Sequence, residues 1–577
     1  MQRIIERQKK GKNEKQAARW LFLVALILGA AGVVNAADFK VAEELRNQTS
    51  GQADVIVTFA HTPTAEHIQS VLQRGGAHRQ HLPFIQAGAF TVPVETLADL
   101  ENDPEVVSVV PDRPLHATSN PYYDYAIETI GANTAVADGY DGTGIAVAVI
   151  DSGVHVHGDL HVGGSSNNPD RVIYQQSFVP GDSSHEDLYG HGTPVAGVVA
   201  DYGAQQAGYP TTYPGVARNV NIVNLKVLDA NGSAVDSTVI AAIQQAISLQ
   251  SQYNIRVINL SLGRGVYESY TKDPLCQAVE AAWKAGIVVV VAAGNGGRDN
   301  TYGTSGYGTI TSPANDPYVI SVGAMRTLGT PSSSDDEIAT YSSKGPTWFD
   351  HIVKPDLVAP GNNINSVLAA ATVTLTTNYP QLILDPSSSS DTPWYITLSG
   401  TSLAAPMVSG AAALMLQKTP SLTPDMVKAR LMKTASKNFP KTSTYTDPTT
   451  AITYTNEYDM FTVGAGYLNI PAALASTDTG TGAALSPVAT YNSTTGKVSL
   501  TYLSGSSVLW GSSVLWGNSV VWGNSVFVNS SSVLWGNSVL WGNSVLWGNS
   551  VLWGSSVLWG SSTDGGDSLW GVRDIDP

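Results

Sequence analysis

The chain has 577 residues, a hydrophobic content of 43% and one cysteine, and its formal net charge is −16. This composition supports large buried cores, spread over about four domains of the usual size, and excludes disorder along the whole chain. The acidic balance argues against nucleic-acid binding, which needs a basic face, and one cysteine excludes a disulfide framework or a cysteine-based zinc site.

The N-terminus has the three parts of a secretory signal. Residues 1–19 carry seven basic and two acidic residues, an uncharged run follows at 20–34, and Val34-Asn35-Ala36 is a small-residue exit. The alternative is an uncleaved membrane anchor, for which the apolar run is short. We therefore expect a cleaved signal peptide at 1–36. Export without disulfides favours a secreted protein or a protein of the bacterial cell envelope.

Residues 53–112 are expected to form a small α+β unit. The pattern predicts strands at 55–59, 89–92 and 106–110, with helices at 66–73 and 94–101. Three prolines and a polar run between 111 and 121 then mark a linker.

From about residue 144 the pattern becomes that of a parallel sheet. Largely apolar runs, typical of strands buried on both faces, occupy 145–150, 222–227, 257–260 and 287–293. Apolar stripes at helical spacing lie between them, and Cys276 is expected to be a small buried side chain on one of them. This alternation predicts an α/β domain with a doubly wound, mostly parallel sheet.

The C-terminal part has its own composition. After Gly480 it is rich in Ser, Thr, Gly and Asn, which predicts a linker at 477–505. Residues 506–577 then contain a six-residue repeat, variants of S/N-S-V-L-W-G. A period of six keeps Val and Trp on one face of a strand, so we expect a β-type repeat that packs on itself. The alternative is a module that binds surfaces or carbohydrate through exposed tryptophans.

Four residues in the α/β region stand where reactive groups often gather, but each has an ordinary explanation. Asp151 ends the first strand in an Asp-Ser-Gly turn, and Asn295 opens an Asn-Gly turn after the strand at 287–293. His191 and Ser402 each precede an uncharged helical segment rich in small residues, where they could cap or pack.

Together, the four segments resemble the subtilase (subtilisin-like serine protease) family. The strings D-S-G at Asp151, H-G-T-P-V-A-G at His191, A-A-G-N at Asn295 and G-T-S-L-A-A-P at Ser402 match the family's motifs, in the family's order. The resemblance covers about residues 53–112 and 121–476. It implies a serine endopeptidase with Ser402 as nucleophile, His191 as general base, Asp151 as its orienting carboxylate and Asn295 as an oxyanion donor.

The resemblance also implies how substrates bind. The segment at 257–263 is similar to the family's substrate-lining strand, so Ser261, Leu262 and Gly263 are expected to pair with an extended protein or peptide substrate. Ala293 and Gly294 would form the other wall of the pocket for the residue before the cut. Both walls are small and uncharged, which favours an apolar or medium-sized residue there.

The resemblance further implies a zymogen, with a propeptide at 37–118 that acts as chaperone and inhibitor and a peptidase domain at 119–476. No cofactor is needed for the chemistry. Compact family members carry a calcium-binding loop after the histidine motif, but residues 201–214 do not match it, so structural calcium is in doubt. We predict no metal ligand and expect His155, His157, His161 and His185 to have structural or surface roles.

An alternative function is that of a surface-attachment or structural protein whose protease domain mainly carries the Trp repeat. A complete triad with an oxyanion asparagine argues against it, because a carrier needs none of the four. In either case the repeat is expected to mediate attachment to a cell surface or self-association.

Overall fold

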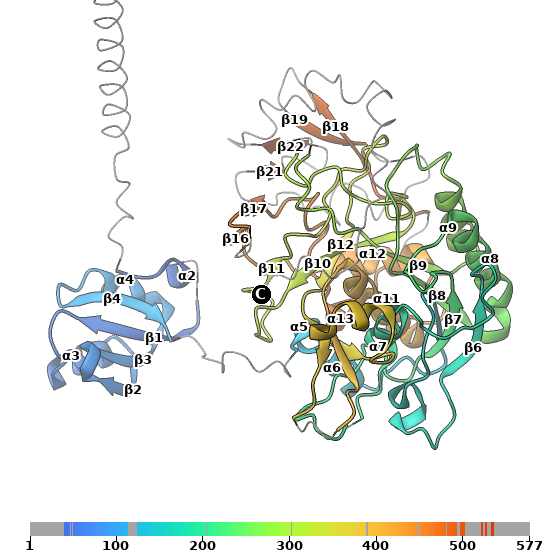
Figure 1. The fold of residues 1–577 in the computed structure, drawn as a ribbon. Coiled ribbons are helices and arrows are strands. Elements are labelled where there is room, and N and C mark those ends of the chain that lie inside the picture. Colours follow the sequence, from blue (N-terminus) through green and yellow to red (C-terminus); the bar gives the residue numbers. More distant parts are fainter. Residues whose placement is uncertain are drawn as a thin grey trace, which may run out of the picture. The chain divides into compact units, whose positions relative to one another are not determined.

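The computed structural model describes residues 40–46, 48, 50–112, 124–204, 206–301, 303–387, 391–447, 450–479, 482–492, 497–501, 503, 521–522, 525–527 and 532–535. The predicted signal peptide, the processing region at 115–119 and most of the Trp repeat lie outside these residues. The chain divides into two units, Met1–Thr118 and Ser119–Pro577, described separately below as the N-terminal and C-terminal units (Figure 1).

The N-terminal unit is built on a four-stranded antiparallel sheet in the order β2-β3-β1-β4. Alternate side chains of β1, Val55, Val57 and Phe59, are buried with Val71 and Leu100 from two helices, because one face of the sheet packs against those helices. Its elements are α2 (Glu43–Arg46), β1 (Gln52–Phe59), α3 (Ala65–Gln73), β2 (Ala77–Leu82), η1 (Pro83–Ile85), β3 (Ala87–Pro93), η2 (Val94–Thr96), α4 (Leu97–Glu101) and β4 (Val106–Pro111). Strand β2 was not predicted, since its sequence AHRQHL has no apolar alternation and its side chains are largely exposed.

The C-terminal unit contains an eight-stranded sheet in the order β11-β10-β9-β8-β5-β7-β6, with β12 beside β10. Every pair in it is parallel except β10 with β11. The strands are β5 (Ala146–Asp151), β6 (Val172–Ser177), β7 (Asn221–Lys226), β8 (Ile255–Leu260), β9 (Val288–Ala292), β10 (Ile320–Arg326), β11 (Glu337–Ile338) and β12 (Leu357–Pro360). Strands β5 and β9 are buried at every residue, so both faces of the sheet are covered. The predicted α/β domain with a mostly parallel sheet is confirmed.

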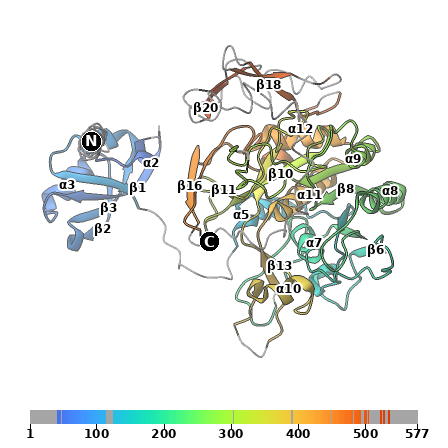
Figure 2. The same ribbon diagram turned by 45° about the horizontal axis from the view of Figure 1, so that its top comes forward.

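Helices α7 (Gly192–Ala200) and α11 (Thr401–Lys418) pack against each other, and so do α8 (Asp236–Tyr253) and α9 (Pro274–Lys284) (Figure 2). Helix α11 is buried from Thr401 to Leu416 and also packs on β8, β9 and β10, because its sequence there is uncharged and rich in small and apolar residues. The other helices are α5 (Ala126–Thr129), α6 (Ala132–Ala137), η3 (Gly158–Leu160), η4 (Val162–Gly164), α10 (Thr374–Asn378), η5 (Pro380–Leu382), α12 (Pro424–Thr434) and α13 (Ile470–Ala475). No helix in the described part of the chain combines the length and apolar character needed to cross a membrane.

Smaller sheets complete the unit. One has the order β13-β15-β14, one is the hairpin β16-β17, and one has the order β18-β19-β22-β21-β20. In the last sheet, β22 from the repeat region pairs antiparallel with β19, which precedes the repeat, and β21 and β20 follow in antiparallel order. Their bounds are β13 (Ile364–Val367), β14 (Ile383–Leu384), β15 (Tyr395–Leu398), β16 (Thr442–Thr446), β17 (Thr453–Glu457), β18 (Val488–Asn492), β19 (Lys497–Thr501), β20 (Val521–Trp522), β21 (Ser525–Phe527) and β22 (Ser532–Trp535).

The segment predicted as a linker packs into the C-terminal unit. Ser486 is 1% exposed, and its hydroxyl donates to Asp356 Oδ1 (2.5 Å) and accepts from Lys428 Nζ (2.9 Å). Burial alone would raise the pKa of Asp356, but the charges of Lys354 and Lys428 bring it below its ordinary value. Ser486 therefore completes a buried ionic cluster, and the folded unit continues past residue 476.

We predict that a chain ending at residue 476 is less stable than one ending at residue 502, which retains Ser486. Both the truncation at residue 476 and Ser486→Ala remove the hydroxyl that pairs with Asp356 and Lys428, and the loss of this buried partner should cost about 1–3 kcal/mol. Denaturant unfolding of the two truncations and of Ser486→Ala measures this. Equal free energies of unfolding for the two truncated chains would show that residues 477–502 do not contribute to stability.

Candidate active site

Three neighbouring parallel strands, β5, β8 and β9, end at the same edge of the sheet. Asp151 is the last residue of β5, Ser261 directly follows β8, and Asn295 lies three residues after β9. Helix α7 begins directly after His191, and Ser402 is the second residue of α11. Carboxyl ends of parallel strands are where α/β proteins usually place their sites, and the predicted catalytic residues belong to this edge or to these helix starts.

Asp151 and His191 form a buried pair. His191 Nδ1 lies 2.8 Å from Asp151 Oδ1, and the two residues are 3% and 1% exposed. A carboxylate accepts, so Nδ1 carries the proton and Nε2 of the neutral ring is left as an acceptor. Burial alone would lower the pKa of His191, but the charge and hydrogen bond of Asp151, with the charge of Asp187, raise it above its ordinary value.

The second ring nitrogen of His191 is buried and has no hydrogen-bond partner. Ser402 is 1% exposed, and its hydroxyl donates to the backbone carbonyl of Ser261 (3.2 Å) rather than to His191. The Ser402 side chain must therefore rotate before its hydroxyl can donate to His191 Nε2. An orphaned acceptor in a buried place is costly, and this one is suited to receive a proton.

Asn295 is held in one orientation by the start of α11. Its Oδ1 accepts from the Thr401 backbone N–H (2.9 Å) and from the Thr401 hydroxyl (3.0 Å). With the oxygen occupied, Nδ2 is the available donor, and it lies beside Gly400, where a Cβ would come within 3.3 Å of it. Gly400 has a φ of +156°, so a side chain there would meet both backbone strain and this amide.

A buried polar chain under Ser402 escaped the sequence analysis. The Ser261 hydroxyl donates to the Ser402 carbonyl (2.7 Å) and accepts from Asn259 Nδ2 (3.0 Å), while Ser409 donates to Asn259 Oδ1 (2.8 Å). These bonds join the end of β8 to the first turns of α11. The one signal in the sequence was Asn259, a polar residue inside an otherwise apolar strand.

The two predicted substrate walls meet at Thr311. A Cβ on Gly263 would approach Thr311 Oγ1 to 2.7 Å, and one on Gly294 would approach Thr311 Cγ2 to 2.8 Å. The Thr311 N–H also donates to the Ala293 carbonyl (3.1 Å). Ser261, Leu262 and Ala293 are buried, so the walls offer mainly backbone and small groups.

Comparison with known proteins assigns the family. A family model described as the subtilase family matches residues 142–461. Serine protease AprX of Bacillus subtilis (strain 168) is 38% identical over 327 residues, covering 54% of this chain and 66% of that protein. Subtilisin E of the same strain is 31% identical over 421 residues, covering 72% and 93%. The chain belongs to the subtilase family. It is a subtilisin-like serine protease.

Among solved structures, the crystal structure of a cold adapted subtilisin-like serine proteinase is 31% identical, with a TM-score of 0.36 over 52% of this subtilase and 85% of that chain.

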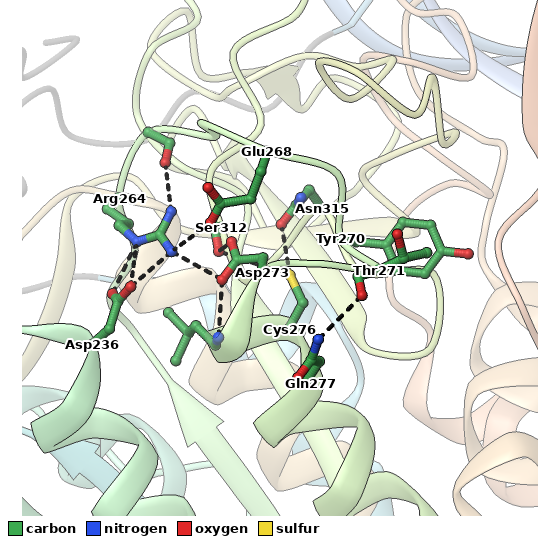
Figure 3. Close-up of polar contacts among 12 residues, drawn as sticks. Asp236, Arg264, Glu268, Tyr270, Thr271, Asp273, Cys276, Gln277, Ser312 and Asn315 are labelled. Atoms are coloured by element: carbon green, nitrogen blue, oxygen red, sulfur yellow. Dashed lines mark hydrogen bonds and ion pairs between the residues drawn. The ribbon is translucent and has the colours of Figure 1, made fainter.

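A pocket of about 470 Å³ continues from the Leu262–Gly263 wall of this subtilase. Its rim carries two exposed apolar side chains, Val235 and Tyr267, which are 61% and 62% exposed. Arg264 on its wall donates to Asp236 (2.9 Å) at the start of α8 and to Asp273 (2.9 Å), the N-cap of α9 (Figure 3). These two ion pairs fix the pocket between the two helix starts.

Cys276 lies behind this ion-pair network. It is fully buried, as the sequence predicted, and its thiol donates to Asn315 Oδ1 at 3.3 Å (Figure 3). Burial raises the pKa of the thiol far above its ordinary value, so Cys276 is not a nucleophile.

Hydrogen bonds from protein groups hold the loop around residues 201–214. The Asp159 carboxylate accepts from the Ala204 N–H (3.1 Å) and the Tyr395 hydroxyl (3.2 Å), so donors occupy its oxygens. The buried Arg171 guanidinium supplies positive charge at this place. It donates to the backbone carbonyls of Asp159, His161, Ala200 and Val220. This subtilase therefore holds the loop with protein donors.

The histidines near Asp151 have separate partners. His155 Nδ1 lies 2.8 Å from Glu186 at the surface, and His161 Nδ1 lies 3.1 Å from the His157 carbonyl. His157 Nδ1 accepts from the Asp159 N–H, and burial lowers the pKa of His157 to about 3. Within the described residues, no group of three or more His, Cys, Asp or Glu side chains is arranged to hold a metal ion.

We predict that Asn295→Ala lowers kcat roughly 10²–10³-fold with little change in KM, because the Asn295 amide would act on the transition state. Asn295→Asp is the matched variant, since it keeps an acceptor for Thr401 but loses the Nδ2 donor, and it should lose at least as much. Steady-state kinetics on a small peptide measures both. An unchanged kcat in Asn295→Ala removes Asn295 from the oxyanion role.

Proposed function

We propose that the chain is a secreted serine endopeptidase that works through Asp151, His191 and Ser402 and is made as a self-processing zymogen. The observation that carries this proposal is the buried Asp151–His191 pair, with His191 Nε2 left unpaired. Asn295 stands beside the start of α11, where Ser402 lies, with its amide nitrogen free to donate.

In the proposed reaction the Ser402 hydroxyl attacks the scissile carbonyl as its proton passes to His191 Nε2. Asp151 keeps the ring in the tautomer that accepts at Nε2 and stabilises the imidazolium that forms. The Asn295 amide and the Ser402 N–H hold the negative charge on the carbonyl oxygen. His191 then gives its proton to the leaving amine, and water hydrolyses the acyl-enzyme by the same steps in reverse.

The substrate is proposed to be an extended protein or peptide paired with Ser261–Gly263, with the side chain before the cut between that segment and Ala293–Gly294. The wall composition supports an apolar or medium-sized residue there. A side chain further upstream would reach the pocket between Val235 and Tyr267, which are exposed apolar residues of the kind that marks binding surfaces.

The remaining parts of the chain are assigned as follows. Residues 1–36 direct export, residues 37–118 are a propeptide that inhibits the peptidase, and the Trp repeat serves cell-surface attachment or self-association. The N-terminal pattern of charge and apolar residues supports export, and the separate four-stranded fold of the N-terminal unit supports a removable propeptide.

Ser402→Ala should abolish peptidase activity and leave a full-length proprotein, because the proposed nucleophile also performs the self-cleavage. Hydrolysis of a chromogenic peptide and the mass of the purified chain measure the two effects. Ser248→Ala, at an exposed position of α8, is a control that keeps the nucleophile. Normal turnover by purified Ser402→Ala would contradict the proposed function.

We also predict that self-cleavage falls between Leu115 and Ser119. The Asn120–Pro121 bond is an unfavourable site, because a proline after the cut lacks an N–H and fits an extended binding cleft poorly. N-terminal sequencing of the mature protein locates the cut. A mature chain that begins before residue 110 or after residue 130 would show that the boundary is misplaced.

A further inference from the structure

A second buried carboxylate lies in the loop that leads to His191. Asp187 is 3% exposed and has no part in the steps proposed above. Its Oδ1 accepts from the Gly190 N–H (2.6 Å) and the Ser152 hydroxyl (2.8 Å), and its Oδ2 accepts from the Thr193 N–H (2.8 Å). One carboxylate thus binds backbone on both sides of His191.

Ser152 connects this carboxylate to the strand that carries Asp151. Its N–H donates to Asp151 Oδ1 (2.7 Å), the same oxygen that faces His191. Its hydroxyl donates to Asp187 and accepts from the Gly192 N–H (2.9 Å). The bonds from Asp187 and Ser152 therefore hold three backbone N–H groups around His191, those of Gly190, Gly192 and Thr193.

The two segments that carry Asp151 and His191 are also in direct contact. A Cβ on Gly192 would come within 2.2 Å of the Gly153 carbonyl, so only glycine permits this approach. Backbones this close transmit a small shift of one segment to the other. The geometry of the Asp151–His191 pair thus depends on the bonds that hold these segments in register.

We propose that Asp187 is a positioning residue for proton transfer, which fixes His191 against Asp151 and favours the imidazolium through its negative charge. This inference rests on the proposed function, because it assumes that His191 is the general base.

The hydrogen-bond pattern favours the carboxylate form of Asp187. Two of its partners are backbone N–H groups, and the third is the Ser152 hydroxyl, which donates to Asp187 and accepts from the Gly192 N–H. Burial raises the pKa of Asp187, while these hydrogen bonds oppose that shift.

The charges that bear on His191 come from two segments. Asp151 at the end of β5 acts most strongly on the pKa of His191, and Asp187 adds to it. The neighbouring Tyr189 is neutral at working pH, because burial raises the pKa of its hydroxyl above its ordinary value. Glu186 is adjacent to Asp187 in sequence but is half-exposed and pairs with His155. It therefore provides a matched control.

The test is the pH dependence of kcat/KM for a small peptide, measured on the mature full-length enzyme and its variants. The neutral form of His191 is active, so activity falls as pH drops through its raised pKa. Asp187→Asn removes the charge and sets an amide against the Thr193 N–H. It should lower kcat roughly 10–100-fold. It should also move the acid limb of the profile, the low-pH range in which kcat/KM falls, roughly 0.5–1 pH unit lower. Glu186→Gln should leave the acid limb in place.

An acid limb that does not move in Asp187→Asn overturns the proposal, whether or not kcat falls, because a purely structural residue would lower kcat alone. If Asp187→Asn does not fold, Ser152→Ala decides, since it keeps the charge and removes the link. It should lower kcat roughly 10-fold at unchanged KM and unchanged limb, and an unchanged kcat overturns the proposal. Absence of turnover by the wild-type enzyme would instead overturn the proposed function, and this inference with it.

Discussion

The hydrogen bond between Asp151 and His191 joins the end of a buried strand to the start of a buried helix, and the arrangement of the site depends on it. Both groups are buried, so the protonation of His191 depends on the neighbouring Asp151 charge rather than on water. Burial alone would favour a neutral imidazole, while the Asp151 charge favours the imidazolium. The second effect prevails, and the pKa of His191 lies above its ordinary value.

Other buried charged groups of the C-terminal unit are also held by hydrogen bonds and opposite charges. Asp356 is stabilised as an anion by two lysines and Ser486, and Arg171 is surrounded by four backbone carbonyls. Asp187 is satisfied by three donors. Each of these groups ties together segments that are distant in sequence. A charge buried with all its partners resists displacement, because losing one partner leaves the rest unpaired. These groups can therefore hold loops that lack regular structure.

The sequence predicted the parts of the fold in which neighbouring residues carry the information. A sheet covered on both faces was indicated by the apolar runs of β5 and β9 and by the uncharged segment that forms α11. The motifs identified four candidate residues, which the structure has at two strand ends, Asp151 and Asn295, and at two helix starts, His191 and Ser402. Strand β2 was missed because it is a largely exposed strand without alternation, stabilised by pairing with β3.

Long-range polar contacts could not be predicted, since nothing in the local sequence reports them. Ser486 lies in a stretch rich in Ser, Thr and Gly that predicted a linker, yet its hydroxyl meets Asp356, 130 residues away. Asp187 lies in an ordinary polar loop, and only the folded chain brings Ser152 to it. The contacts of Arg171 could not be predicted either, because its carbonyl partners are backbone groups of several segments.

The central claim is that the Asp151–His191 pair activates Ser402, and reaction with a fluorophosphonate tests it most directly. The reagent loses fluoride when an activated hydroxyl attacks its phosphorus, and it marks that residue covalently. Peptide mapping of the treated mature protein should find the phosphonyl group on Ser402, and His191→Ala should react far more slowly. A wild-type protein that stays unmodified, or is modified at another residue, would contradict the account.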